Sequence, residues 1–174
     1  MKINLKNRIL FTLLVTILVW AHVLWDYFHG GIPVHYLFHD KDMPGIPNWI
    51  GASILPFYTW WLLLRIQKRQ QKQGANFSIS LVFKRFFLAA ALAITIAVCF
   101  VHGIQIPTGI LLGILGLGII FPLFYSEFLL GWVLGSSFTF GAVIPMGFSP
   151  FLALGCFLLY QIGRGLLLLM RPKT

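Results

Sequence analysis

Charged residues are scarce in this sequence of 174 residues, and carboxylates are the scarcest of all. Only 10% of the residues are charged and only four are Asp or Glu, whereas 59% are hydrophobic. A soluble domain carries about 25% charged residues, with which it covers its surface. The shortage excludes an ordinary soluble domain. It indicates an integral membrane protein with a single domain, 1–174, most of whose outer surface faces lipid.

Cysteines and the common catalytic motifs are also nearly absent. Cys99 and Cys156 both lie inside apolar stretches, where a lone cysteine usually packs rather than forming a disulfide. No serine has the G-x-S-x-G surroundings of an activated nucleophile, and no H-E-x-x-H zinc motif occurs. The net charge of +9 does not indicate a nucleic-acid partner, because Lys and Arg lie between the apolar stretches instead of on one face.

Six apolar stretches are long enough, or nearly long enough, to cross a membrane. A span needs about 20 apolar residues, and in lipid its backbone must satisfy its own hydrogen bonds, as a helix does. The strict alternation of a β-barrel is absent. We therefore expect an all-α, polytopic membrane protein with spans at about 9–28, 49–64, 82–102, 107–125, 128–144 and 151–170.

The basic residues predict how these spans are oriented. They precede the first span, fill the connection between the second and third, and follow the last: Lys2, Lys6, Arg8, Arg65, Lys68, Arg69, Lys72, Lys84, Arg85, Arg171 and Lys173. With six spans all of them fall on one side, and the opposite loops hold only Lys41. Cytoplasmic loops are enriched in Lys and Arg, so we expect both termini in the cytoplasm and the protein in a bacterial inner (plasma) membrane. Membrane lipids are the expected partners, with anionic headgroups near the connection 67–80.

Glycine is frequent in the second half of the chain. The pairs Gly109/Gly113 and Gly131/Gly135 have the small-xxx-small spacing that lets helix backbones approach closely in lipid. Tight packing of the last three predicted spans within one subunit is one interpretation. The other is a homo-oligomer, or a partner membrane protein docked on the glycine-rich helix faces.

Most of the polar residues that can carry chemistry lie in one stretch, 20–48, which holds four of the five histidines and three of the four acidic residues. His22, Asp26 and His29 follow the spacing i, i+4, i+7 and form one stripe near the end of the first span. Contact of such a stripe with lipid is costly. We therefore expect it to face the interior of the bundle or a water-filled cavity.

The residues after this stripe are expected to form a short interfacial or re-entrant segment. Gly30-Gly31 should end the first helix, and His35 and His39 have the i, i+4 spacing of a new helical turn. Asn48 is predicted to cap the second span. A structured return of about 18 residues is more typical of a functional segment than of a bare connector.

Histidine and carboxylate side chains on one side of the membrane predict a metal site. The predicted ligands are His22, His29, His35, His39 and His102, and the predicted catalytic carboxylates are Asp26, Asp40 and Asp42. A divalent ion, with zinc preferred, would activate water or polarise an ester. We therefore expect a hydrolase of a lipid or lipid-linked substrate. A plan of six helices with outward histidines is similar to that of membrane-embedded zinc hydrolases of the alkaline ceramidase type, from which no residue role is taken.

Other interpretations use the same residues. The segment from His35 to Asp42 can be a solvated polar surface. An ion- or proton-coupled transporter or channel would use His22 and Asp26 as its pathway. A non-catalytic membrane assembly subunit would use the glycine faces.

Two further ionisable residues, Glu127 and Arg164, lie near the predicted cytoplasmic side. The structural interpretation is an ion pair between them that locks the last three spans. The functional interpretation is a site for an anion or a lipid headgroup.

Overall fold

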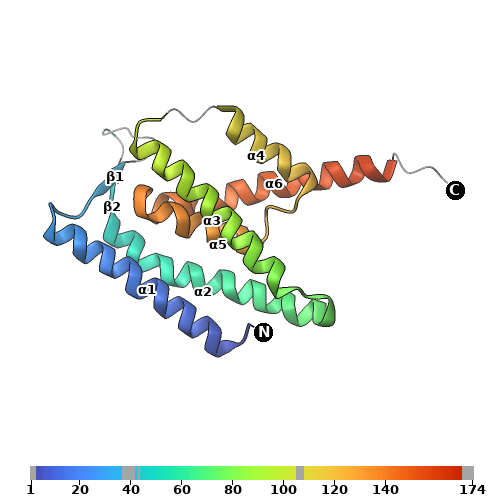
Figure 1. Ribbon diagram of the computed structural model, residues 1–174, viewed down its shortest axis with the longest axis horizontal. Helices are drawn as coiled ribbons and strands as arrows, with labels where there is room; N and C mark the ends of the chain where they lie inside the picture. Colours follow the sequence, from blue (N-terminus) through green and yellow to red (C-terminus); the bar gives the residue numbers. More distant parts are fainter. Residues whose placement is uncertain (1–2, 37–41, 43, 105–107, 170–174) are drawn as a thin grey trace.

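A computed structural model of the protein describes residues 3–36, 42, 44–104 and 108–169, and helices dominate it (Figure 1). In chain order the elements are α1 (Leu5–Phe28), β1 (Val34–Tyr36), β2 (Gly45–Pro47), α2 (Asn48–Gln73), the 3-10 turn η2 (Gly74–Asn76), α3 (Ile79–Val101), α4 (Thr108–Ile120), α5 (Ser126–Phe140) and α6 (Val143–Leu169). A helix overlaps each of the six predicted stretches, so the all-α class is confirmed.

Three of these helices are long and apolar enough to cross a membrane, namely α1, α3 and the Val143–Leu166 part of α6. The 13 residues of α4 and the 15 of α5 would extend over about 20 and 23 Å, against about 30 Å of hydrocarbon. α2 has 26 residues, but its second half carries Arg65, Lys68, Arg69 and Lys72. The described part of the chain therefore has three candidate spans, which is consistent with a membrane protein, and the six-span arrangement stays a prediction.

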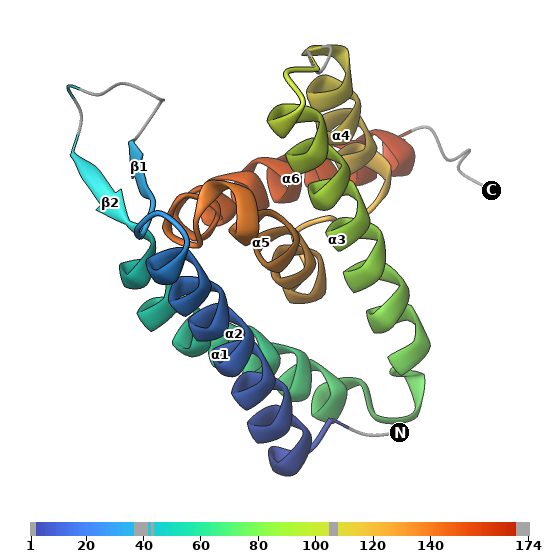
Figure 2. The same cartoon turned by 60° about the vertical axis from the view of Figure 1, so that its left-hand side comes forward.

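α5 lies at the centre of the helix arrangement and packs against α2, α3 and α6 (Figure 2). α1 and α2 form an antiparallel pair on one side, and α4 packs on α6. One core cluster joins α1, α2 and α5 through residues that include Val19, Leu55 and Val133. A second joins α2, α3 and α5 through residues that include Leu62 and Leu130. The two clusters hold α5 between the α1–α2 pair and α3.

The close approach of α3 and α5 depends on glycine. A Cβ on Gly131 would clash with the carbonyl oxygen of Phe86, and a Cβ on Gly135 would lie 2.7 Å from the carbonyl oxygen of Ala90. This glycine pair therefore packs within the chain, but its partner is α3, the third predicted span, rather than one of the last three as predicted. A Cβ on Gly113 in α4 would meet no atom within 4 Å. The prediction of an external partner therefore concerns α4.

The segment after α1 is extended at His35, which corrects the predicted helical turn. β1 and β2 pair antiparallel, with Val34 opposite Pro47 and His35 opposite Ile46. Gly30 and Gly31 have φ of 124° and 101°, which redirects the chain as α1 ends. Pro47 rather than Asn48 caps α2, and no side chain bonds the cap. His39 and Asp40 lie outside the described residues.

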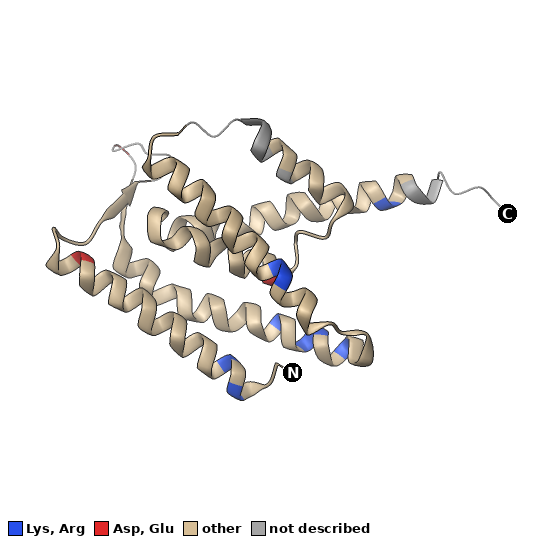
Figure 3. Cartoon of the chain, in the orientation of Figure 1, with Lys and Arg blue, Asp and Glu red and all other residues tan. Residues whose placement is uncertain are grey.

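Charge is distributed unevenly along the molecule (Figure 3). Lys and Arg gather where α1 begins, where α2 ends and in the first turns of α3. Asp26 lies near the opposite end of α1. The described basic residues of these three helices therefore share one end of the molecule, as the predicted orientation requires.

Candidate functional site

His22 and Asp26 form a pair on one face of α1, one helical turn apart. His22 Nε2 lies 3.7 Å from Asp26 Oδ2, and both side chains are partly buried. That distance is too long for a hydrogen bond, so there is room for a small adjustment or a bridging atom. Asp26 Oδ2 is buried without a hydrogen-bond partner among the described residues. The pair therefore has acceptor capacity that the described part of the chain leaves unused.

His29 does not join this pair. α1 ends at Phe28, and the His29 ring turns back to stack on Trp25, with ring centroids 3.8 Å apart. Its Nδ1 lies 2.9 Å from the carbonyl oxygen of Trp25. Because the helix ends before a further turn is complete, the i+7 position of the predicted stripe leaves the helix face.

A second polar group lies where α5 meets α6. A Cβ on Gly141 would lie 3.1 Å from His35 Nε2 and 3.2 Å from Asn48 Oδ1. Gly141 has φ of 68° and ends α5, so the corner requires glycine for both its conformation and its space. Asn48 is buried, and its backbone N–H donates to the carbonyl oxygen of Pro33. The hairpin base is thus held against the α5–α6 corner.

The predicted metal ligands do not form a cluster in the described part of the chain, where no three His, Cys, Asp or Glu side chains lie within reach of one ion. His102 follows the last residue of α3 and is exposed, as is Asp42. His39 and Asp40 lie outside the described residues. Of the predicted set, the structure brings His22 and Asp26 together.

An apolar cavity of about 230 Å³, here called the outer groove, has His22 of this pair among its lining residues. Its polar lining comes from His22, Asn48 and Ser137, and its other lining residues are Phe11, Leu14, Val15, Leu18, Val19, Leu55, Phe86, Leu134 and Phe138. The His22 ring packs edge-on against Phe138, with centroids 5.2 Å apart. The groove therefore offers an apolar chamber with an imidazole and an amide among its lining groups.

A second cavity, the inner groove, lies further toward the basic end and has a volume of about 160 Å³. It shares Phe11 and Phe86 with the outer groove, and its charged lining residues are Arg8 and Glu127. Arg8 and His22 are 14 positions apart on α1, about 21 Å along the helix. The two grooves therefore run along one face of α1, with ionisable side chains among the lining of each.

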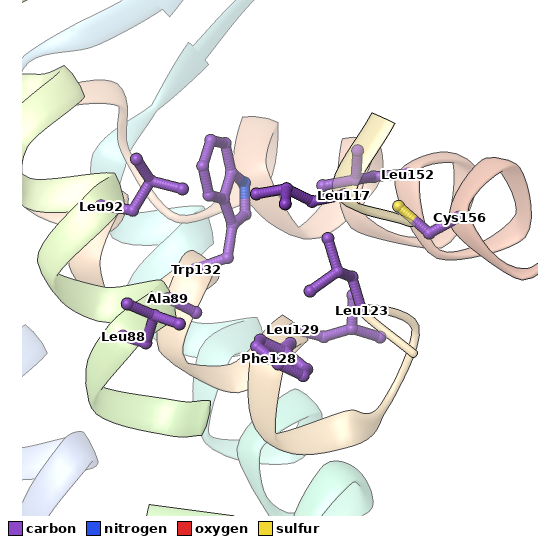
Figure 4. Close-up of a pocket in the computed structure, with 10 residues that line it drawn as sticks. All are labelled: Leu88, Ala89, Leu92, Leu117, Leu123, Phe128, Leu129, Trp132, Leu152 and Cys156. Carbon is purple, nitrogen blue, oxygen red and sulfur yellow. The ribbon is translucent and has the colours of Figure 1, made fainter. Parts of the chain in front are cut away.

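A third cavity, of about 380 Å³, lies between α3, α4, α5 and α6 (Figure 4). Its lining residues are Leu88, Ala89, Leu92, Leu117, Leu123, Phe128, Leu129, Trp132, Leu152 and Cys156. The Trp132 indole N–H and the Cys156 thiol are the polar groups of these side chains. No acid or base faces it from this set. The cavity suits an apolar molecule and offers no acid–base chemistry.

Glu127 is fully buried at the basic end and bonds two arginines. Arg69 Nη2 lies 2.9 and 2.8 Å from its two carboxylate oxygens, and Arg85 Nη1 lies 3.0 Å from Oε1. Both guanidinium groups also lie over the Tyr125 ring, 4.5 and 4.8 Å from its centroid. Arg164, the predicted partner of Glu127, is exposed, and Glu127 pairs with Arg69 and Arg85 instead. The predicted ion pair is therefore wrong. α2 continues past the predicted span, which carries Arg69 to the start of α5.

Arg8 is a buried cation that the sequence prediction missed. Its Nη1 donates to Gln67 Oε1 at 2.8 Å, and its guanidinium stacks 3.8 Å from the Trp60 ring centroid. Its Nε is buried without a hydrogen-bond partner among the described residues. A signal existed, since Arg8, Val15 and Val19 follow a helical spacing and are all buried. From the sequence alone, the basic N-terminal group indicates only the orientation of the first span.

Comparisons with protein-family models, with curated proteins and with solved structures find no match. The function is therefore argued from geometry alone. Two features are open to a ligand: the His22–Asp26 pair near the outer groove, and Arg8 in the inner groove.

Proposed function

We propose that the protein binds a lipid or lipid-linked molecule in the outer groove and hydrolyses the linkage beside its headgroup. The observation that carries the proposal is the His22–Asp26 pair at an apolar groove, with a buried carboxylate oxygen that lacks a hydrogen-bond partner in the described residues. An acyl or isoprenoid chain fits the apolar lining. The polar linkage of the same molecule would then lie beside the pair.

His22 is the proposed general base. It takes a proton from a water molecule, whose oxygen attacks the carbonyl carbon of the ester, and it returns the proton to the departing alkoxide. The products are a carboxylic acid and an alcohol. Asp26 stabilises the imidazolium that forms, as carboxylates do beside catalytic histidines. The Asn48 amide is the proposed donor to the oxyanion, because it is buried and lines the same groove.

A divalent metal, with zinc preferred, stays part of the proposal because imidazole and carboxylate are its common ligands. His22 and Asp26 would supply two donors. Metal analysis of the purified protein tests this part separately. One zinc per chain in the wild type, lost in His22→Ala, supports metal-activated water, whereas hydrolysis by metal-free protein supports His22 as the base.

The proposal is tested by incubating the purified protein in nanodiscs with phospholipids, glycerolipids and isoprenoid-linked lipids, and by following products with mass spectrometry. We expect one class to be cleaved. His22→Ala and Asp26→Asn should each reduce kcat by at least about 100-fold, the range of general acid–base catalysis. His29→Ala is the matched control, because His29 is the same residue type on the same helix end but stacks on Trp25.

The control should keep wild-type activity. An equal loss in His29→Ala would show that the pair has no special role. Wild-type protein that retains lipids but cleaves none of the panel would contradict the proposed hydrolysis and support lipid binding alone.

A further inference from the structure

The buried guanidinium of Arg8 has no anionic partner among the ion pairs of the described residues. Its side chain is only 7% exposed, and its one hydrogen-bond acceptor in the described residues is the neutral amide of Gln67. The ion pairs of the described part of the chain use His22, Arg69 and Arg85 as their cations. A buried charge without a counter-charge is costly, so an anion at this position would stabilise the fold.

Glu127 does not supply that anion, although it lines the same groove. Its two oxygens already accept hydrogen bonds from Arg69 and Arg85. With Arg8, the cluster holds three arginines and one carboxylate, which leaves two positive charges in excess. The charge therefore favours a ligand that is negative.

Apart from Asn7, the other lining residues of the inner groove are apolar, and part of this wall faces outward. Four phenylalanines line it, Phe11 from α1 and Phe83, Phe86 and Phe87 from α3. Phe83 and Phe87 are 43% and 62% exposed, so this wall is open to the surroundings of the helices. In a membrane protein those surroundings are acyl chains.

We infer that the inner groove binds an anionic phospholipid, with its phosphate at Arg8 and an acyl chain along the phenylalanines. Stacking on Trp60 fixes the plane of the guanidinium, and Gln67 accepts a hydrogen bond from Nη1. The Nε–H has no hydrogen-bond partner in the described residues, so the guanidinium keeps donor capacity for a phosphate oxygen. Arginine is well suited to this role because its planar group donates directionally to phosphate. A free phosphate ion would leave the phenylalanine wall unused. The inference rests on Arg8 alone and does not depend on hydrolysis at His22.

Native mass spectrometry tests the inference. The protein is released from micelles that contain phosphatidylglycerol and phosphatidylcholine at equal mole fractions, and the two lipid adducts are counted. We expect the wild type to favour phosphatidylglycerol by about tenfold, the ratio that 1.4 kcal/mol produces. Arg8→Gln should lower the preference to near unity. Arg164→Gln removes the same charge from an exposed arginine and should keep it.

A second measurement does not depend on any variant. Phosphatidylglycerol with a photoreactive group on its acyl chain is cross-linked to the wild type, and the labelled peptides are sequenced. Labels should fall on α1 and α3 near Phe11 and Phe83, and unlabelled phosphatidylcholine should compete about tenfold less well than unlabelled phosphatidylglycerol. Equal adducts of the two lipids, equal losses in both variants, or labels spread over all helices would each overturn the inference.

Discussion

At the scale of single residues, the two ends of the molecule hold buried charges that differ in how completely they are paired. Glu127 accepts three hydrogen bonds from two arginines. Asp26 has a histidine at 3.7 Å and an oxygen without a hydrogen-bond partner in the described part. A fully bonded carboxylate is typical of a structural element, whereas one with a free acceptor can take a proton or a ligand.

Replacing Glu127 with Gln should destabilise the protein strongly. The change removes the negative charge between Arg69 and Arg85 and leaves two partly buried cations beside each other. Loss of one partner from a buried pair costs about 3–5 kcal/mol. The free energy of unfolding, measured in mixed detergent micelles, should fall by this amount. Arg164→Gln, at an exposed position, should change it by less than about 0.5 kcal/mol. Similar values for the two variants would contradict the structural role of Glu127.

Part of the site could be predicted from residue spacing, and part could not. The i, i+4 relation placed His22 and Asp26 on one face correctly, because both lie within an uninterrupted helix. The prediction for His29 was wrong because α1 ends at Phe28, and the His29 ring makes a local i, i+4 contact with Trp25 instead of continuing the stripe. The predicted partner of Glu127 was also wrong, because Arg69 reaches Glu127 only if α2 continues through the polar connection.

At the scale of secondary-structure elements, a hydrogen-bond chain joins α2 to α6. The Tyr58 hydroxyl lies 2.5 Å from Ser149 Oγ, which donates to the carbonyl oxygen of Met146 at 3.0 Å. Pro150 lies inside α6 and has no N–H with which to bond that carbonyl. Ser149 therefore replaces the missing helix bond and connects the site of the break to α2.

A double-mutant cycle should reveal this coupling. Ser149→Ala leaves the Tyr58 hydroxyl and the Met146 carbonyl without this partner, which we expect to cost about 1–3 kcal/mol of unfolding free energy. Tyr58→Phe leaves the Ser149–Met146 bond intact and should cost about 0.5–1.5 kcal/mol. The double variant should be more stable than the sum of the single changes implies. Strict additivity would show that the two hydroxyl groups do not interact.

The space around two helix glycines, one in α5 against α3 and one in α4, predicts opposite effects of Gly→Ala changes on stability. Gly135→Ala places a Cβ 2.7 Å from the Ala90 carbonyl oxygen and should destabilise the protein by about 1–3 kcal/mol, as overpacking does. Gly113→Ala lies within α4 with open space around it and should be neutral or stabilise by up to about 1 kcal/mol, because alanine favours helix. Thermal unfolding in detergent compares the two. Equal shifts would contradict the close contact.

Element positions were predictable because long apolar runs and the glycines that end them dominate local structure. The residues at which the elements begin and end were less predictable. α6 begins at Val143 rather than near 151, since the positive φ of Gly141 ends α5 early and Pro150 is accommodated inside the helix. The β1–β2 pair was missed because the i, i+4 spacing of His35 and His39 resembles a helical turn, whereas the backbone at His35 is extended.

At the scale of the whole molecule, the arrangement in the membrane decides which grooves face which leaflet. If all six helices cross, the basic ends of α1, α2 and α3 share the cytoplasmic side. If only α1, α3 and α6 cross, α2 stays on the side where α1 ends. The end of α2 that carries its arginines then lies outside the cell. The second arrangement would place Arg69 and Arg8 on opposite sides of the membrane. The structure instead places Gln67, two residues before Arg69, in contact with Arg8.

Cysteine labelling distinguishes these arrangements at two positions. In a background of Cys99→Ala and Cys156→Ala, single cysteines replace Asn76 and Ile104, both exposed at opposite ends of α3. Six crossings predict that a membrane-impermeant maleimide labels position 104 in intact cells and position 76 only after permeabilisation. Three crossings predict the reverse for both. Because the Arg8–Gln67 bond and the Glu127 cluster hold the ends of α1, α2 and α3 together, we expect label at position 104 in intact cells, the result that requires α2 to cross as in the six-span arrangement.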